Sequence, residues 1–202
     1  LSLFLFSVSS YSQDKIKSNV EFTSDSLEVD ENKNLMIATG NVVIKSQNET
    51  IKADEVIYDK NLDKALASGN ISIFNNDGTI YETSEVTLTN EFKNVLALTL
   101  FAQFKDNSKI KASKFLKTNE ESIFINGEYT PCDCDFKNNE KPIWQLNSSK
   151  ITHDINKKTI YFKNVILKIF DFPIFYFPFL SHPDPSVKRR SGFLTPTWSS
   201  SS

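Results

Sequence analysis

Apolar and polar residues alternate along much of the chain before residue 130. A period of two places every second side chain on the same face of a β-strand. No stretch in this part shows a convincing apolar period of 3.6 residues, which would be typical of a helix. The clearest alternating pairs are Leu27 and Val29, Val42 and Ile44, Ile71 and Ile73, and Val86 and Leu88.

Clusters of Asn, Asp and Gly separate the alternating segments, at residues 30–34, 59–61 and 75–78. These residues tolerate positive φ angles and hydrogen-bond to their own backbone, so they favour tight turns. This pattern of alternating segments joined by turns predicts an all-β fold. Its interior would be apolar, and its exterior would carry Lys, Asn, Asp and Glu.

The chain also repeats itself with a period of 29 to 30 residues. A third copy follows the first two with a slip of one residue, near residues 86–97. A period of this length indicates stacked supersecondary units. Identical residues that meet at an offset of 29 include Asp25 and Asp54, Gly40 and Gly69, and Asn41 and Asn70.

In such a stack each layer buries its apolar face only against the next layer, so the core forms a continuous line. If the two walls close, the interior is core alone, and the periodicity by itself favours this arrangement. If the walls splay, the interior becomes an apolar trough that could hold acyl chains. The end strands would expose backbone groups to which another β-chain could add. The residues predicted to line the groove are Val42, Ile44, Ile71, Ile73 and Leu88.

Charge and motifs exclude several classes of function. The chain has 202 residues, with 23 basic and 25 acidic side chains and a formal net charge of −2, which argues against a nucleic-acid partner. The chain contains no run of 18 apolar residues, so the sequence predicts no transmembrane helix. Because no nucleophile elbow, phosphate loop or metal-ligand motif appears, we predict no catalytic residue, no metal and no cofactor.

Residues 1–12 combine a short apolar run with a small-x-small ending, Ser10-Tyr11-Ser12. This pattern is typical of the second half of a secretory signal peptide, with cleavage before Gln13. The alternative is a buried first strand. Since the only methionine is Met36, we expect the sequence to be a piece of a longer, exported protein.

The segment after residue 128 carries blocks rich in proline and aromatic residues. These blocks are Tyr129-Thr130-Pro131-Cys132, Pro142-Ile143-Trp144-Gln145-Leu146, Phe172-Pro173-Ile174-Phe175-Tyr176-Phe177-Pro178-Phe179-Leu180, and Arg190-Ser191-Gly192-Phe193-Leu194-Thr195-Pro196. In this order they resemble the LptD family of lipopolysaccharide-assembly outer-membrane proteins. The repeats of residues 20–128 resemble the OstA-type periplasmic domain of that family, and the resemblance covers nearly all of the chain.

The resemblance implies an OstA-like open β-jellyroll of stacked antiparallel strands, followed by the truncated start of an outer-membrane β-barrel. Residues 13–128 would form the jellyroll repeats, and residues 129–188 its last strands and the junction to the barrel. Residues 189–202 would begin the first barrel strand. An outer-membrane barrel needs at least about 8 strands of ~10 residues, so the barrel itself is missing.

Three prolines acquire expected roles from this resemblance. Pro173 and Pro178 would lie at the junction between the groove and the barrel. Pro196 matches a family proline that weakens the seam between the first and last barrel strands, because proline cannot donate to a strand ladder.

The resemblance also implies a function without covalent chemistry. The groove would accept acyl chains of lipopolysaccharide from an LptA-type periplasmic bridge protein that adds to the edge of the sheet. It would pass them to a barrel that is plugged by an LptE-type lipoprotein and opens laterally. The expected location is the outer membrane, with this part mostly in the periplasm.

Cys132 and Cys134 are the only cysteines. In an exported protein they are expected to be oxidised. A bridge between positions two apart is strained, so each cysteine is expected to pair elsewhere, and the resemblance suggests partners in the absent part of the barrel. Two cysteines without a neighbouring histidine supply only half of a tetrahedral metal site, so a metal is a weaker interpretation than a structural disulfide. A free or redox-active thiol is the other alternative.

Two further clusters lie near the end of the chain. Lys188, Arg189 and Arg190 could contact lipid phosphates, although an ordinary interfacial anchor explains them as well. The aromatic cluster is predicted to pack at the junction of groove and barrel or to contact lipid, and core packing fits each ring equally well. Its members are Phe162, Phe170, Phe172, Phe175, Phe177 and Phe179.

Two alternative functions stay open at this point. The first is a free-standing periplasmic lipid bridge of the same fold, against which the Ser-Gly-Phe-Leu-Thr-Pro block argues. The second is a β-helical carbohydrate-active enzyme, which would need carboxylates on adjacent layers of one outer face. The repeat places Asp25 and Asp54 in register, but a role in turns explains both better.

Overall fold

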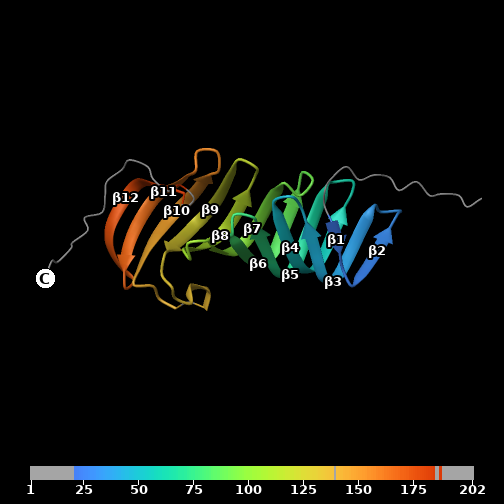
Figure 1. Ribbon diagram of the computed structural model, residues 1–202, viewed down its shortest axis with the longest axis horizontal. Helices are drawn as coiled ribbons and strands as arrows, with labels where there is room; N and C mark the ends of the chain where they lie inside the picture. The colour runs from blue at the N-terminus through green and yellow to red at the C-terminus, as the bar shows by residue number, and fades with distance from the viewer. Residues whose placement is uncertain (1–20, 139, 185–186, 188–202) are drawn as a thin grey trace, which may run out of the picture.

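The protein forms one antiparallel sheet, which a computed structural model describes for residues 21–138, 140–184 and 187 (Figure 1). The sheet has twelve strands in this part of the chain. A single 3-10 turn, η1 (Phe136–Asn138), lies between the ninth and tenth strands. The strands are β1 (Glu21–Thr23), β2 (Ser26–Asp30), β3 (Leu35–Lys45), β4 (Glu49–Asp59), β5 (Lys64–Asn75), β6 (Ile80–Thr89), β7 (Asn94–Gln103), β8 (Lys109–Lys117), β9 (Glu121–Thr130), β10 (Trp144–Asp154), β11 (Thr159–Ile169) and β12 (Phe172–Pro183).

Strand order in the sheet follows the order of the sequence. From β3 to β11 each strand pairs with the strand before it and the strand after it, and β12 pairs with β11 alone in the described sheet. β1 and β2 both pair with β3, one with each half, so together they take the place of a single strand. The predicted all-β stack of antiparallel strands is therefore confirmed.

The 29-residue repeat corresponds to one pair of strands, and equivalent turns of successive repeats lie against each other. The Asn76 side chain donates a hydrogen bond of 2.7 Å to the carbonyl of Gln47, 29 residues earlier. The backbone N–H of Glu91 donates one of 2.8 Å to the carboxylate of Asp63, 28 residues earlier. The Asn and Asp residues that predicted the turns thus also join neighbouring layers.

Most strands bend once near the middle, and the bend interrupts the alternation of side chains. In β4, Ala53 and Val56 both face the core although they are three positions apart. The register between β4 and β5 shifts at the same place, between Lys52 and Glu55. Gly69 occupies the bend with a φ of 96°, a conformation that favours glycine.

Aspartates secure the first two bends. The Asp54 carboxylate accepts hydrogen bonds of 2.9 Å from both the backbone and the side chain of Asn70. Asp25 accepts an equivalent bond of 2.8 Å from the Asn41 side chain. The role in turns that we predicted for these two aspartates is therefore corrected: they hold the bends rather than the ends of the strands.

Later bends use hydroxyl groups in place of the carboxylate. The Asn126 side chain donates to the Ser113 hydroxyl at 3.1 Å, and Asn164 donates to Ser149 at 3.1 Å. The polar pairs therefore continue along the outside of the bends from the first layers to the last.

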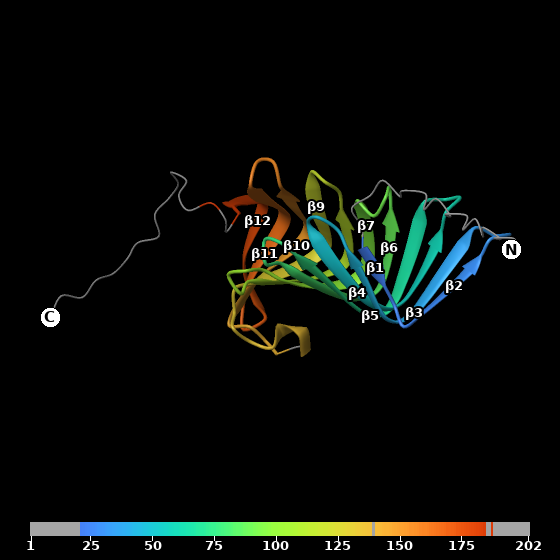
Figure 2. The ribbon, with the colours of Figure 1, turned by 45° about the vertical axis from the view of Figure 1, so that its right-hand side comes forward.

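The bends divide the sheet into two walls, and Figure 2 shows β1 and β2 leaving the bend beside β3 in different directions. Buried apolar side chains fill the interior as one cluster that extends from Ala38 in β3 to Val165 in β11. The name wall A is used for the strand halves beside the turns at 31–34, 60–63, 90–93, 118–120 and 155–158. The name wall B is used for the halves beside the turns at 46–48, 76–79, 104–108, 131–143 and 170–171.

Several predicted features lie outside the described residues. They are the signal-peptide remnant at 1–12, the basic residues Lys188 to Arg190, the barrel strand at 189–202 and its Pro196. Among the described residues, no helix has the length and apolar character needed to cross a membrane.

The bend predicts a specific effect of adding one methyl group at Gly69. In Gly69→Ala the new Cβ would overlap the Asp54 carboxylate, and the positive φ would itself cost about 1–2 kcal/mol. Gly78→Ala is the matched control, because its φ is 90° but the nearest atom to a Cβ would be 3.4 Å away. We expect Gly69→Ala to lower the free energy of unfolding, measured in urea, by clearly more than Gly78→Ala does. Equal losses would show that the Asp54 contact does not matter.

Candidate functional site

The five residues predicted to line the groove lie together inside the sheet. Val42, Ile44, Ile71 and Ile73 project from wall B, and Leu88 projects from wall A. Each of the five is at most 3% exposed. The alternation therefore identified the inner face correctly. In this part of the molecule, however, the interior is packed rather than open.

Three aromatic rings close the middle of the interior. Tyr81 comes from β6 in wall B, whereas Phe115 and Phe124 come from β8 and β9 in wall A. The ring centroid of Phe115 lies 4.9 Å from that of Tyr81 and 4.9 Å from that of Phe124. Since β6 and β8 are not neighbours in the sheet, the contact between Tyr81 and Phe115 crosses from one wall to the other.

The hydroxyl group of Tyr81 reaches toward the rim of the two walls. Burial raises its pKa, and the negative charge of Asp77 raises it further. Hydrogen bonds with the side chains of Ser122 and Asn75 act in the opposite direction. Ser122 belongs to wall A and Asn75 to wall B, so this hydroxyl is held by both walls.

An ion pair joins the walls above the rings. The ammonium group of Lys117 in β8 pairs with the Glu49 carboxylate in β4 and donates a hydrogen bond of 3.2 Å to the Asn75 side chain. Three strands separate β4 from β8 in the sheet, so this pair also crosses the interior. A hollow of about 820 Å³ lies here, between turns 46–48 and 76–79 of wall B and turns 90–93 and 118–120 of wall A. We call this region the mouth.

Neither contact between the walls was predicted from the sequence. Lys117 follows Phe115 by two positions, so it lies on the same inward face of β8. A charged residue in the inward phase of an alternating strand was the signal that could have identified it.

The interior is exposed at the N-terminal end of the sheet. Phe22, Leu27 and Val29 pair with inward-facing positions of β3, but they are 38%, 49% and 51% exposed. No strand precedes β1 and β2 in the described sheet, so the edge formed by these two strands leaves backbone groups unpaired.

The other end of the described sheet is more aromatic. Phe175 and Phe177 of β12 lie opposite the inward residues Leu167 and Val165, yet Phe175 is 60% exposed. The outer face of the same strand carries Tyr176 and Phe179. Of the predicted aromatic cluster, Phe162 is a core residue, and the other five phenylalanines are exposed on β12 or in the turn before it.

Prolines recur along this edge strand. Pro173 and Pro178 lie within β12, and Pro183 ends it. The N–H of Asp184 donates a hydrogen bond to the carbonyl of Lys158 in the neighbouring turn. Successive N–H groups of an antiparallel strand point to opposite sides, so the nitrogen of Pro183 points away from β11. A proline there removes a donor from the open edge without breaking the ladder.

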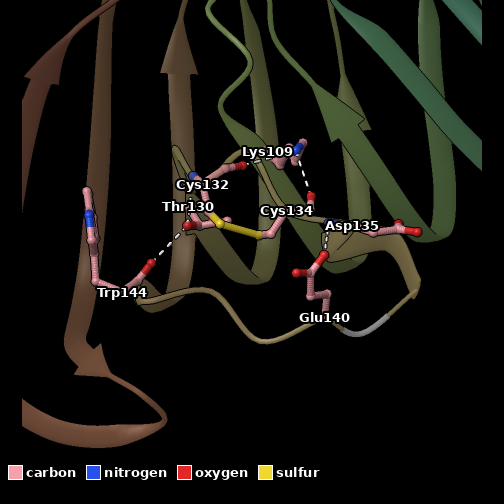
Figure 3. The surroundings of a disulfide bond; sticks show 7 residues. All are labelled: Lys109, Thr130, Cys132, Cys134, Asp135, Glu140 and Trp144. Carbon is pink, nitrogen blue, oxygen red and sulfur yellow. Dashed lines mark hydrogen bonds between the residues drawn. A yellow bond between two sulfur atoms is a disulfide. The ribbon is translucent and has the colours of Figure 1, made fainter.

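The structure contains a disulfide bond between Cys132 and Cys134 (Figure 3). The structure pairs the two cysteines with each other, whereas the sequence analysis expected each to pair with a distant cysteine. Both residues lie in the irregular loop after β9, where no ladder holds the chain extended. Their Cα atoms are 5.3 Å apart, within the usual range for a disulfide.

A buried lysine holds the disulfide loop. The Lys109 ammonium group donates hydrogen bonds of 3.0 and 2.8 Å to the carbonyls of Cys132 and Cys134. The Thr130 hydroxyl donates at 2.8 Å to the carbonyl of Trp144, which ties the two ends of the loop together (Figure 3). The loop is therefore fixed to the sheet.

The described residues contain no group of three His, Cys, Asp or Glu side chains that could hold a metal ion.

Comparison with known proteins identifies the family. A family model described as "LptA/(LptD N-terminal domain) LPS transport protein" matches residues 21–159, which is more than half of the chain. The chain belongs to this family. The LptA/LptD N-terminal domain family consists of lipopolysaccharide transport proteins and not of enzymes.

Similar proteins carry the name LPS-assembly protein LptD. The chain is 31% identical over 166 residues to the protein from Burkholderia thailandensis, which covers 81% of this chain and 20% of the relative. It is 30% identical over 169 residues to the protein from Burkholderia lata, which covers 83% of this chain and 21% of the relative. The chain thus spans about a fifth of the length of these relatives.

A solved structure also resembles the chain. It is the crystal structure of LptH, the LptA homologous periplasmic component of the lipopolysaccharide transport device from Pseudomonas aeruginosa. The match has a TM-score of 0.43 and 14% sequence identity, and it covers 49% of this chain and 75% of that chain.

The contacts of Lys109 predict that Lys109→Met loosens the disulfide loop. Two partly buried carbonyls would lose their donor, at a cost of roughly 1–3 kcal/mol. We expect faster amide hydrogen exchange in peptides that cover residues 131–143, measured by mass spectrometry. Lys114→Met on the outer face of β8 is the control and should leave that exchange unchanged. Protection of the loop equal to that of the unmodified chain would contradict the role of Lys109.

Proposed function

We propose that this domain conveys the acyl chains of lipopolysaccharide along the interior of the folded sheet. The observation that supports this most is the continuous apolar interior, whose inward side chains become exposed at both ends of the described sheet. Val42, Ile44, Ile71, Ile73 and Leu88 would contact the chains during passage. Burial of each acyl CH₂ group would contribute about 0.8 kcal/mol to binding. Because this contribution is similar in every layer, no single layer would hold the lipid much more tightly than the others.

The N-terminal end is the proposed entrance. There the edge of β1 and β2 offers unpaired backbone groups, beside the exposed Phe22, Leu27 and Val29. An LptA-type periplasmic bridge protein of the same fold would add its own strand to this edge. The two apolar interiors would then form one continuous path.

The β12 end is the proposed exit. This strand is apolar on both faces, which is unusual for an edge in contact with water. An outer-membrane barrel that is plugged by an LptE-type lipoprotein would receive the lipid here and release it through a lateral seam at Pro196. Pro173 and Pro178 would lie at the junction, where missing N–H groups limit pairing with the wrong strand. The protein would be located in the outer membrane, with this domain in the periplasm.

A free-standing lipid bridge without a barrel is the second candidate. The two ends of the sheet differ in a way that argues against it. A repeating bridge needs matching edges, but the edge of β12 carries three prolines and the edge of β1 and β2 carries none. A carbohydrate-active enzyme is not proposed, because Asp25 and Asp54 hold the bends of a transport-family fold.

The proposed entrance can be tested with Leu27→Asp. Leu27 is half exposed, so the substitution leaves the packed core intact, unlike a charge at the buried Ile73. A photo-reactive benzoyl-phenylalanine at Phe22 would report contact with purified lipopolysaccharide. Losing the burial of one leucine should weaken labelling roughly tenfold, because a buried leucine contributes about 1.5–3 kcal/mol.

Ser26→Asp is the matched control, because it adds the same charge to the outer face of the same strand. It should leave the labelling at Phe22 unchanged. If Leu27→Asp also leaves the labelling unchanged, or if the unmodified chain is not labelled at all, the proposed function is wrong.

A further inference from the structure

The interior of the sheet is closed by two layers of contacts between the walls, one above the other. The deeper layer consists of the rings of Tyr81, Phe115 and Phe124, which are 3%, 0% and 0% exposed. The shallower layer consists of Lys117, Glu49 and Asn75 at the mouth. The two layers share β8, because Phe115 and Lys117 are neighbours on its inner face.

The rings leave no space for an acyl chain at this level. Each packs against another ring with centroids 4.9 Å apart, which is direct contact between aromatic side chains. A chain that travels from Phe22 to Phe175 must therefore displace Tyr81 from Phe115, and this requires wall B to move away from wall A.

The ion pair at the mouth resists this movement. The side chains of Lys117 and Glu49 are only 17% and 11% exposed, so each charge depends on the other while the walls are closed. Once the walls part, water can hydrate both charges. In the closed state each charge is paired with the other, and in the open state each charge is hydrated by water. In a half-open state neither charge is paired or fully hydrated.

The geometry points to a gate in the middle of the lipid path, formed by the rings of Tyr81, Phe115 and Phe124 and latched by the pairing of Lys117 with Glu49 and Asn75. This inference rests on the proposed function, since it concerns the passage of acyl chains through the same interior. It adds that the interior is not a permanent trough. The two ends are accessible at all times, and the middle opens only when the walls separate.

The test combines three photo-reactive probes with a tether between the walls. Benzoyl-phenylalanine is placed singly at Phe22, Phe115 or Phe175, which lie at the entrance, in the gate and at the exit. Glu49→Cys and Lys117→Cys are then joined across the mouth in the folded protein with a bis-maleimide that contains a cleavable disulfide. Cys132 and Cys134 are bonded to each other and do not react.

Purified lipopolysaccharide micelles are the probe ligand. We expect the tether to lower labelling at Phe115 about tenfold, because the fraction of molecules in the open state falls. Labelling at Phe22 and Phe175 should persist, and cleavage of the tether with dithiothreitol should restore labelling at Phe115. Equal labelling at Phe115 with and without the tether would overturn the gate.

The matched control is a tether between Glu49→Cys and Asn75→Cys. These residues are register partners on adjacent strands of wall B, so this tether removes the latch but leaves the walls free to part. Labelling at Phe115 should equal or exceed that of the chain without a tether, and a loss equal to that from the first tether would overturn the gate. Absence of labelling at all three probes in the unmodified chain would refute the proposed function itself.

A single substitution tests the latch without any tether. Lys117→Met keeps the length of the side chain but removes its charge. It leaves the Glu49 carboxylate unpaired in the closed state, so we expect labelling at Phe115 to rise at least a few-fold. Lys114→Met on the outer face of β8 is the control and should change nothing. A fall in labelling in Lys117→Met would contradict the latch.

Discussion

The rest of the structure depends on the bend in the middle of the strands. A flat sheet with one apolar face would expose that face to water, and no helix in the described residues covers it. Bending the sheet at the same level in successive layers brings the two halves of the apolar face together. Gly69 and its equivalent Gly40 permit the bend, and the carboxylates of Asp54 and Asp25 secure it. The interior, its two ends and its mouth are all consequences of this geometry.

Much of the fold could be predicted because the signals are local. The pairs Val42 and Ile44, and Ile71 and Ile73, alternate within half a strand, so their burial follows from the period of two. The bend was not predicted, although the repeated Gly-Asn pair marks it. A period of two describes a straight strand, and the change of phase between Ala53 and Val56 falls outside it.

The partners in the contacts between the walls could not be predicted, because they depend on the bend angle and the twist of the whole sheet. Nothing near Tyr81 in the sequence indicates that it packs against Phe115 and Phe124. The disulfide depends in a similar way on Lys109, which lies 23 residues before Cys132 and supports the loop by hydrogen bonds to its backbone. The loop is also not extended, since the Cα atoms of Cys132 and Cys134 are 5.3 Å apart.

The sequential order of the strands has a consequence for how the chain folds. Because the main ladders join consecutive strands, a layer can form as soon as its residues are available, without waiting for the end of the chain. Folding of this kind involves short-range contacts and is generally fast. A chain that emerges gradually from an export channel could therefore build its layers one after another, starting from β2 and β3. Only the contacts between the walls, such as that of Lys117 with Glu49, would have to wait until strands from several layers had formed.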